Sequence, residues 1–206
     1  MFLKEQISET NACIAASGGT VTAFVCDDNR TNQAFYKKFK TVPGKPWRTT
    51  ENQFLLFDYV HLAKSIRNNW VTEKTGQLVY EDNGIQKTAM WAHLVQLFKA
   101  ESESQFTKLS KLKEAAVMPK NTEKQSVPLC LQVFCDETAA ALLRHPAMKN
   151  VQGVEDTALF IQKVVAFWKI INVKREGIDF RRNDPLKAVI SDANDDRLDF
   201  LQEFGV

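Results

Sequence analysis

The chain has 206 residues, of which 44% are hydrophobic and 25% are charged, and its formal net charge is +2. This length can bury one substantial core, or one small core and part of another. The near-neutral charge excludes a uniformly basic nucleic-acid-binding protein, so any contact with phosphate must be local. Residues 1–20 lack a signal-peptide core, and no apolar run is long enough to cross a bilayer. We therefore expect a soluble intracellular protein without a membrane partner.

The first part of the chain predicts a piece of an α/β sheet. Its expected elements are, in order, a weakly helical start, a strand at Val21–Cys26, a helix within residues 29–40, a turn-rich connector at residues 41–47, a strand at Phe54–Phe57 and a helix at Tyr59–Trp70. A stable sheet needs more strands than these. The sheet is therefore expected to be incomplete, as though the sequence began partway through a domain.

The rest of the chain predicts a helical unit. Its expected elements are, in order, a hairpin-like piece around GQLVYEDNG (residues 76–84) with a candidate strand at Leu78–Tyr80, helices at Lys87–Ala100 and Phe106–Ala116, a helical segment within residues 126–145, a helix at Asp156–Ile171 and a last helix at residues 195–204. Ser126 is a good helix cap, and Pro128 fits a first helical turn. The predicted fold class is thus an α/β fragment over residues 1–57 followed by a mostly α-helical domain over residues 58–206, helix-dominated overall.

Two carboxylates, Asp27 and Asp58, come directly after the predicted strands. The carboxyl ends of strands in α/β proteins gather ligands, and a cluster of carboxylates can hold the Mg²⁺ ions of two-metal phosphoryl transfer. Aspartate is also a favoured helix cap, so the residues alone leave both interpretations of Asp58 open. The apolar stripe of the helix after Asp58 places Lys64, Arg67 and Asn68 nearer its exposed side.

Other candidate motifs favour structural roles. The four cysteines, Cys13, Cys26, Cys130 and Cys135, lack the spacing of a zinc site or a disulfide framework and are expected to be reduced, packed thiols. The stretch GIQKT at residues 84–88 resembles the tail of a P-loop but lacks the required glycines, which favours a helix start. Trp91 and His93 are expected to lie in a core. The lysines at 108, 111 and 113 form either a solvated face or a phosphate contact.

Five separated stretches resemble one family, the P-element-type DNA transposases and their THAP-domain relatives. FDYVHLAKSIRNNW (residues 57–70) resembles the family motif D-x-x-H-L-x-K-x-x-R-N, and VCDDNRTNQAFYKKF (residues 25–39) resembles its strand–Asp–x4–Asn–helix segment. The other three are KLSKLKEAAVMP (108–119), SVPLCLQVFCDETAAAL (126–142) and FWKIINVKR (167–175), and the order and spacing agree over about residues 20–200.

The resemblance implies a ribonuclease-H-like catalytic fold interrupted by a mostly helical GTP-binding insertion domain. In that family Mg²⁺ is held by an Asp–Asp–Glu set, whose second acid corresponds to Asp27. Asp58 then lies at a structural junction, where it caps and orients the helix that carries His61, Lys64, Arg67 and Asn68. Nothing in this sequence matches the first acid or the glutamate, so the resemblance implies a chain without strand-transfer activity of its own.

For the nucleotide, the family contacts carry over to Lys111, Val127 and Asn172. Three positions depart from the family: Ser126 replaces a lysine, Cys135 a serine, and Lys169 the aspartate that reads guanine. A carboxylate accepts hydrogen bonds from the guanine edge, whereas an ammonium group can only donate. The departure at Lys169 therefore bears directly on GTP binding.

The leading hypothesis is a partial P-element-like transposase that acts on transposon-end DNA in the nucleus. One alternative is a helical module that binds a nucleotide or the DNA backbone through lysines 108, 111 and 113 and arginines 181 and 182. Another is a domesticated remnant without catalysis, whose exposed half-sheet would favour self-association.

Overall fold

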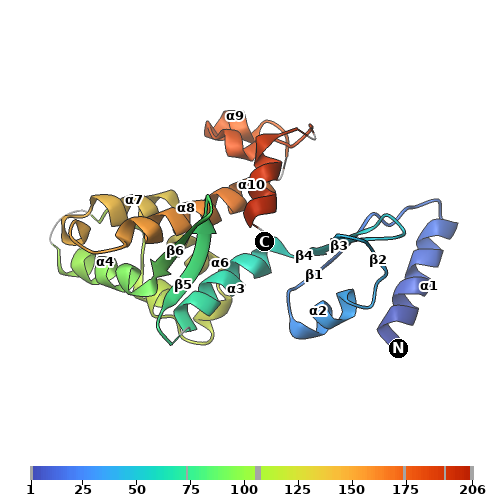
Figure 1. Ribbon diagram of the computed structural model, residues 1–206, viewed down its shortest axis with the longest axis horizontal. Coiled ribbons are helices and arrows are strands. Elements are labelled where there is room, and N and C mark those ends of the chain that lie inside the picture. Colours follow the sequence, from blue (N-terminus) through green and yellow to red (C-terminus); the bar gives the residue numbers. More distant parts are fainter. Residues whose placement is uncertain (1, 73, 105–107, 174, 193, 205–206) are drawn as a thin grey trace. The chain divides into compact units, whose positions relative to one another are not determined.

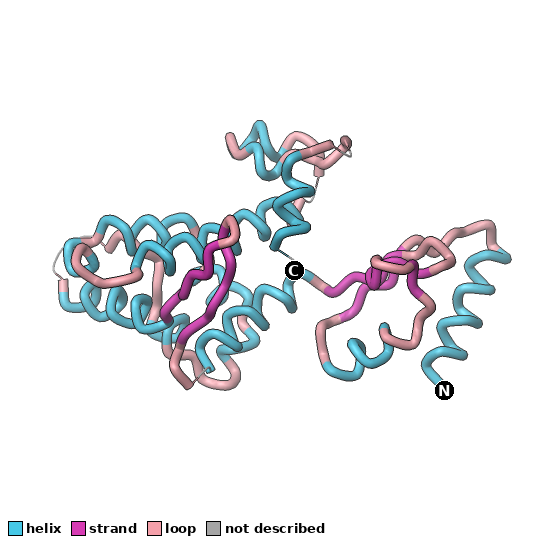
Figure 2. The backbone as a smooth tube through the Cα atoms, in the orientation of Figure 1, coloured by secondary structure: helices cyan, strands magenta, loops and turns pink. Residues whose placement is uncertain are grey.

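The computed structural model describes residues 2–72, 74–104, 108–173, 175–192 and 194–204. The chain divides into two compact units, Met1–Leu62 and Ala63–Val206, which together form a helix-dominated α/β protein with two small sheets (Figures 1 and 2). The predicted fold class is confirmed. None of the helices in the described segments has the length and apolar character needed to span a membrane.

The first unit is a four-stranded sheet with helices. Its elements are α1 (Phe2–Ala16), β1 (Ala23–Cys26), α2 (Arg30–Tyr36), β2 (Thr41–Val42), β3 (Lys45–Thr49) and β4 (Phe54–Phe57). The strand order is β1-β4-β3-β2; β1 and β4 run parallel, with Cys26 opposite Phe57, and β3 is antiparallel to both of its neighbours. The strand predicted at Phe54–Phe57 is confirmed.

The segment expected to be a connector, residues 41–47, instead forms β2 and the start of β3. The chain reverses at Gly44, whose φ of 73° suits a residue without a side chain. Thr41 then pairs with Thr49, and Val42 with Lys45. The prediction was wrong because this hairpin is held by backbone pairing and has almost no buried apolar face to mark it in the sequence.

One face of the first sheet is covered and the other is open. Phe35 and Tyr36 of α2 pack on Leu55, and the Tyr36 hydroxyl lies 2.8 Å from the carbonyl oxygen of Phe24 and 2.9 Å from that of Leu56. On the opposite face, Val25 is 65% exposed and Leu56 is 45% exposed. Buried and exposed residues normally alternate along a strand in this way when a sheet buries only one of its faces.

The second unit is built from helices around one β-hairpin. Its elements are α3 (Tyr59–Thr72, which begins in the first unit), β5 (Gln77–Asp82), β6 (Ile85–Met90), α4 (Trp91–Glu103), α5 (Glu114–Val117), α6 (Val127–Val133), α7 (Asp136–Arg144), α8 (Val154–Ile171), α9 (Ile178–Arg182) and α10 (Asp196–Phe204), with short 3-10 turns at Glu123–Gln125, Pro146–Met148 and Pro185–Lys187. Helix α8 packs against α7 and β6. Its apolar side meets a ring cluster in which Trp70 lies edge-on to Trp91 and Phe160.

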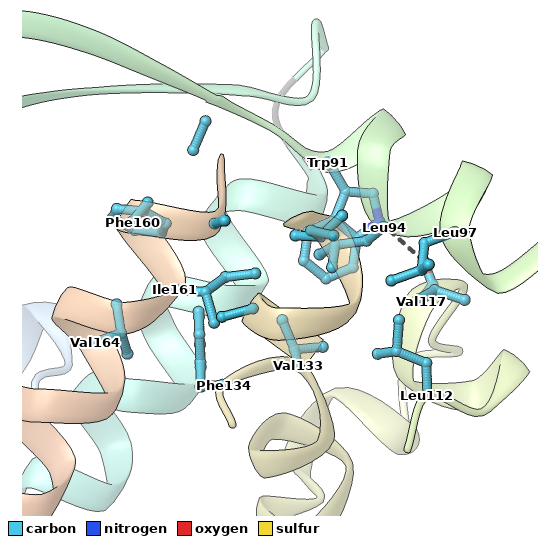
Figure 3. Packing of buried hydrophobic residues seen from close by; sticks show 14 of the residues in the cluster. Trp91, Leu94, Leu97, Leu112, Val117, Val133, Phe134, Phe160, Ile161 and Val164 are labelled. Atoms are coloured by element: carbon cyan, nitrogen blue, oxygen red, sulfur yellow. Dashed lines mark hydrogen bonds between the residues drawn. The ribbon is translucent and has the colours of Figure 1, made fainter. Parts of the chain in front are cut away.

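Figure 3 shows the interior of this unit, where side chains from α4, α6 and α8 converge. Trp91 is buried, as expected, and its indole N–H donates to the carbonyl oxygen of Val117 at 2.9 Å. Trp70 donates in the same way to Ala89 at 3.2 Å. These bonds satisfy the polar ends of two large buried rings, which ties α3 to β6 and α4 to α5.

Two expectations for the region of the hairpin were wrong. The helix expected from Lys87 begins at Trp91, because residues 87–90 pair with β5 across a turn at Asn83-Gly84, where both residues have positive φ. GIQKT is accordingly turn and strand, and not a helix start. The segment within residues 126–145 is helical as expected, with Ser126 as the cap and Pro128 in the first turn, and it forms two helices, α6 and α7.

The prediction of a helix at Phe106–Ala116 was also wrong over residues 108–113, which the structure describes as non-helical. Residues 105–107 lie outside the described residues, and of the remainder only Glu114–Val117 is helical. The buried carboxylate of Glu101 explains the loop before it, since it accepts from the backbone N–H groups of Leu109 and Ser110, each at 2.8 Å, and from the Ser110 hydroxyl. A side chain thus takes the place of helical hydrogen bonds.

Candidate functional sites at the strand ends and at the end of α8

Asp27 and Asp58 follow neighbouring parallel strands and lie at the same edge of the first sheet. The backbone N–H of Asp58 donates to the carbonyl oxygen of Cys26 at 2.7 Å, which continues the β1–β4 ladder up to the two acids. The structure thus places the two acids that the sequence singled out at the same edge of the sheet. Their hydrogen-bond partners differ.

Asp27 organises the start of α2. Its Oδ1 accepts from the side-chain amides of Asn29 at 2.6 Å and Asn32 at 2.5 Å, and Asn29 in turn caps α2 by accepting from the backbone N–H of Asn32. The neighbouring Asp28 accepts from the side-chain amide of Gln33 at 2.7 Å. The amide donors to Asp27 are neutral, so these hydrogen bonds orient its carboxylate without compensating its negative charge.

Asp58 organises the start of α3. Its Oδ1 accepts from the backbone N–H of Val60 at 2.9 Å, and its Oδ2 lies 2.7 Å from Nδ1 of His61. A carboxylate at this position satisfies one of the free N–H groups of the first turn and complements the helix dipole. The geometry is that of a cap, which is the role that a structural junction requires.

Arg67 lies on the buried side of α3, although the sequence placed it on the exposed side. Its side chain is fully buried, on the same face as Ala63 and Trp70. The guanidinium donates to the carbonyl oxygens of Lys124 at 2.6 Å and Glu123 at 3.4 Å, and Asn68 donates to the same Lys124 oxygen at 3.2 Å. Burial lowers the pKa of Arg67.

The prediction for Arg67 was wrong because the stripe was drawn through apolar residues alone, whereas the buried face of α3 runs through Ala63, Arg67 and Trp70. Arg67 and Asn68 instead form a carbonyl clamp, by which we mean the three hydrogen bonds from these two side chains to the turn at Glu123–Gln125 and its neighbours. This turn leads directly into Ser126, which caps α6 through the backbone N–H of Leu129. Lys64, by comparison, is partly exposed on α3.

The predicted nucleotide contacts lie on three different elements of the second unit. Lys111 is in the loop held by Glu101, Val127 is the first residue of α6, and Asn172 ends α8. The Lys111 ammonium group pairs with Glu137, and the hydrogen bond raises the pKa of Lys111. One turn before Asn172, Lys169 lies 2.8 Å from Asp136 and 3.2 Å from Asp184. Sequence reasoning identified Lys169 but neither of its partners.

The acids at the strand ends do not fit a two-metal centre. Within the described residues, no group of three or more histidine, cysteine, aspartate or glutamate side chains is arranged to hold a metal ion. Asp27 and Asp58 supply two carboxylates, and Asp58 is already bound by the helix that it caps. A Mg²⁺ pair needs more oxygen ligands than this edge presents.

Comparison with known proteins gave two matches. A family model described as the TNP-like, GTP-binding insertion domain matches residues 60–178, which is more than half of the chain. Among solved structures, the Drosophila P element transposase strand transfer complex matches with a TM-score of 0.74 and 19% sequence identity, over 96% of this chain and 44% of that one. A search of curated proteins found no relative.

At 19% identity the structural match shows a shared fold, and this chain spans less than half the length of the transposase chain that it matches. The family match is independent of it and covers the helical unit. Together they confirm the resemblance to P-element-type transposases that the sequence motifs indicated.

Proposed function

Since this chain belongs to the TNP-like, GTP-binding insertion domain family, we propose that it serves in DNA transposition as a transposase-type protein without strand-cutting activity of its own. The observation that carries the proposal is the likeness in fold to a P element transposase, which extends over 96% of the chain and so includes the sheet as well as the insertion domain. Its partner is then transposon-end DNA, and its place of action the nucleus.

The absence of independent cutting follows from the carboxylates. Two-metal cleavage requires several acids to converge on ions that bridge the attacking and leaving oxygens. Asp27 is the single acid that corresponds to the family's metal ligands, while Asp58 is engaged by Val60 and His61. The edge of this sheet can position one carboxylate but cannot assemble the cluster.

A plasmid-nicking assay with Mg²⁺ or Mn²⁺ tests this part of the proposal. The purified chain should nick supercoiled DNA no faster than its Asp27→Asn variant. Nicking that the wild-type chain performs and Asp27→Asn abolishes would show that the chain has a complete catalytic site.

The transposition role is tested in cells that carry an excision reporter and an active transposase of the same family. Co-expression of this chain should change the excision frequency, because a protein that shares the fold and the DNA partner competes for the ends or joins the complex. An unchanged frequency at equal transposase levels would contradict the role.

A second candidate function, binding of the DNA backbone, is favoured by exposed cations in the second unit. They are Lys108, Lys111, Lys113, Arg181 and Arg182, which are all exposed. Binding through phosphate contacts releases counterions, so the affinity for a short duplex should fall steeply as KCl is raised. An affinity measured by fluorescence anisotropy that does not change with salt would exclude this mode.

A further inference from the structure

An ion-pair cluster lies at the end of the second unit where α7 begins and α8 ends. We define it by six side chains, Lys111, Asp136, Glu137, Lys169, Asp184 and Lys187. Lys169 is its centre: Nζ lies 2.8 Å from Oδ2 of Asp136 and 3.2 Å from Oδ2 of Asp184. Asp184 is also 3.4 Å from Nζ of Lys187. The cluster joins α8, the first turn of α7 and the residue that precedes the turn at Pro185–Lys187.

The pair between Lys169 and Asp184 is the well-shielded part of this cluster. The two side chains are 19% and 16% exposed, whereas Asp136 is 64% exposed and Lys111 is 67% exposed. Burial raises the pKa of Asp184, but the hydrogen bond and the charge of Lys169 outweigh it and hold that pKa below its usual range. Exposed pairs contribute little because water and salt screen them, so Lys169 and Asp184 are the members that matter.

The charges of this cluster are already balanced. Its three ammonium groups face three carboxylates, so a nucleotide triphosphate would find no uncompensated positive charge among these side chains. A phosphate is usually held by cations and N–H groups that are free to bond it. To reach Lys169, it would have to displace Asp184, which is 16% exposed, and leave that shielded carboxylate without this partner, which costs free energy.

The hydrogen-bonding polarity is also wrong for guanine. The resemblance implies an acceptor at position 169 for the N1–H and N2–H donors of guanine, and an ammonium group offers only donors. Lys169 therefore cannot accept from the base, and it already donates to two carboxylates. The residues present do not fit the ligand after which the family is named.

We propose that Asp184 acts as the chain's own ligand for Lys169, so that internal ion pairs close this end of the helical unit and exclude guanosine triphosphate. The segment Ile178–Lys187, which contains α9, is thereby attached to α8 by a side-chain contact as well as by the packing of its last turn. The inference is independent of any role in transposition, because it concerns the folding and ligand binding of the isolated chain.

Two measurements on the full chain without DNA test the proposal. Isothermal titration with GTP and Mg²⁺ should give no binding heat, and GTP should not raise the melting temperature. The second measurement is trypsin cleavage after Arg182, which is exposed on α9. Lys169→Gln and Asp184→Asn should each speed this cleavage about fivefold, because loss of a contact worth a small part of the total stability raises the population of the open segment by about that factor.

Lys163→Gln is the matched control. Lys163 is on the same helix, is 24% exposed and pairs with Asp82 of the hairpin, away from this cluster. Its loss should leave cleavage after Arg182 unchanged. Should Lys169→Gln unfold the unit, as judged by circular dichroism, Asp184→Asn still gives the result, since it keeps the size of the side chain. Saturable binding of GTP to the wild-type chain would overturn the proposal, as would an unchanged cleavage rate in Asp184→Asn.

Discussion

The carbonyl clamp formed by Arg67 and Asn68 leads to the sharpest prediction for stability. The guanidinium is fully buried, and its hydrogen bonds to the backbone of Lys124 and Glu123 replace a carboxylate partner. Charge-assisted hydrogen bonds stabilise a fold by about 1.5–3 kcal/mol, whereas the burial of a charge works against it. Whether Arg67 raises or lowers the free energy of unfolding therefore depends on which of these two contributions is larger.

Arg67→Met separates these two contributions, because methionine fills much of the same space without donating hydrogen bonds. If the clamp dominates, the free energy of unfolding should fall by about 2 kcal/mol. Arg67→Ala should cost about 4 kcal/mol, since it also leaves a cavity beside Trp70. In urea unfolding followed by tryptophan fluorescence, the methionine variant should lower the midpoint by about 1 M at an unchanged slope.

Arg144→Met is a suitable control, because Arg144 is exposed at the end of α7 and its replacement should change stability by less than about 0.5 kcal/mol. A methionine variant at position 67 that is as stable as the wild type, or more stable, would refute the reasoning. It would mean that desolvation of the charge costs at least as much as the two carbonyl contacts of Arg67 return.

Three further predictions concern other parts of the molecule. Burial lowers the pKa of His93 from its ordinary 6.5, so as the pH falls the unfolded chain binds this proton before the folded chain does. The free energy of unfolding should therefore be constant above about pH 7 and decrease as the pH drops through 6.5. In urea titrations His93→Gln should remove this decrease. Burial also raises the pKa of Cys130 to about 11, so iodoacetamide at mildly alkaline pH should label the exposed Cys13 and spare Cys130, as mass spectrometry of peptides would reveal; equal labelling would contradict this. Finally, Leu56→Lys and Val25→Lys change the open face of the first sheet, and each should reduce any concentration-dependent self-association seen by light scattering without lowering the melting temperature.

The sequence predicted those elements whose apolar residues repeat at a regular spacing. Helix α8 was expected from Asp156 and begins at Val154, and β4 was expected with the bounds that it has. In both, burial of one face sets the pattern, so the pattern can be read locally. The β5–β6 hairpin was expected around residues 76–84, a stretch that includes the Asn83-Gly84 turn, but its second strand was missed because residues from Lys87 on were assigned to a helix.

The contacts that define the candidate sites could not be derived in this way. Arg67 donates hydrogen bonds to backbone carbonyl oxygens 56 and 57 positions further along the chain. The sequence around Arg67 gives no indication of these acceptors. Lys169 stood out because it replaces an acid, but Asp136 and Asp184 became its partners only through the packing of α7 and of the turn after α9 against α8. Such pairings depend on tertiary structure.

The two acids at the strand ends illustrate why proximity does not assign a role. The partners of Asp27 are side-chain amides of Asn29 and Asn32, which can rotate away if a cation or further acids approach. Asp58 accepts from the backbone N–H of Val60, which cannot leave without opening the first turn of α3. If another segment brought acids to this edge, Asp27 could join them at small cost, whereas Asp58 would have to give up the cap. The hydrogen-bond donors therefore hold Asp58 more firmly than Asp27, and on this ground we propose Asp27 as the better candidate for metal chemistry.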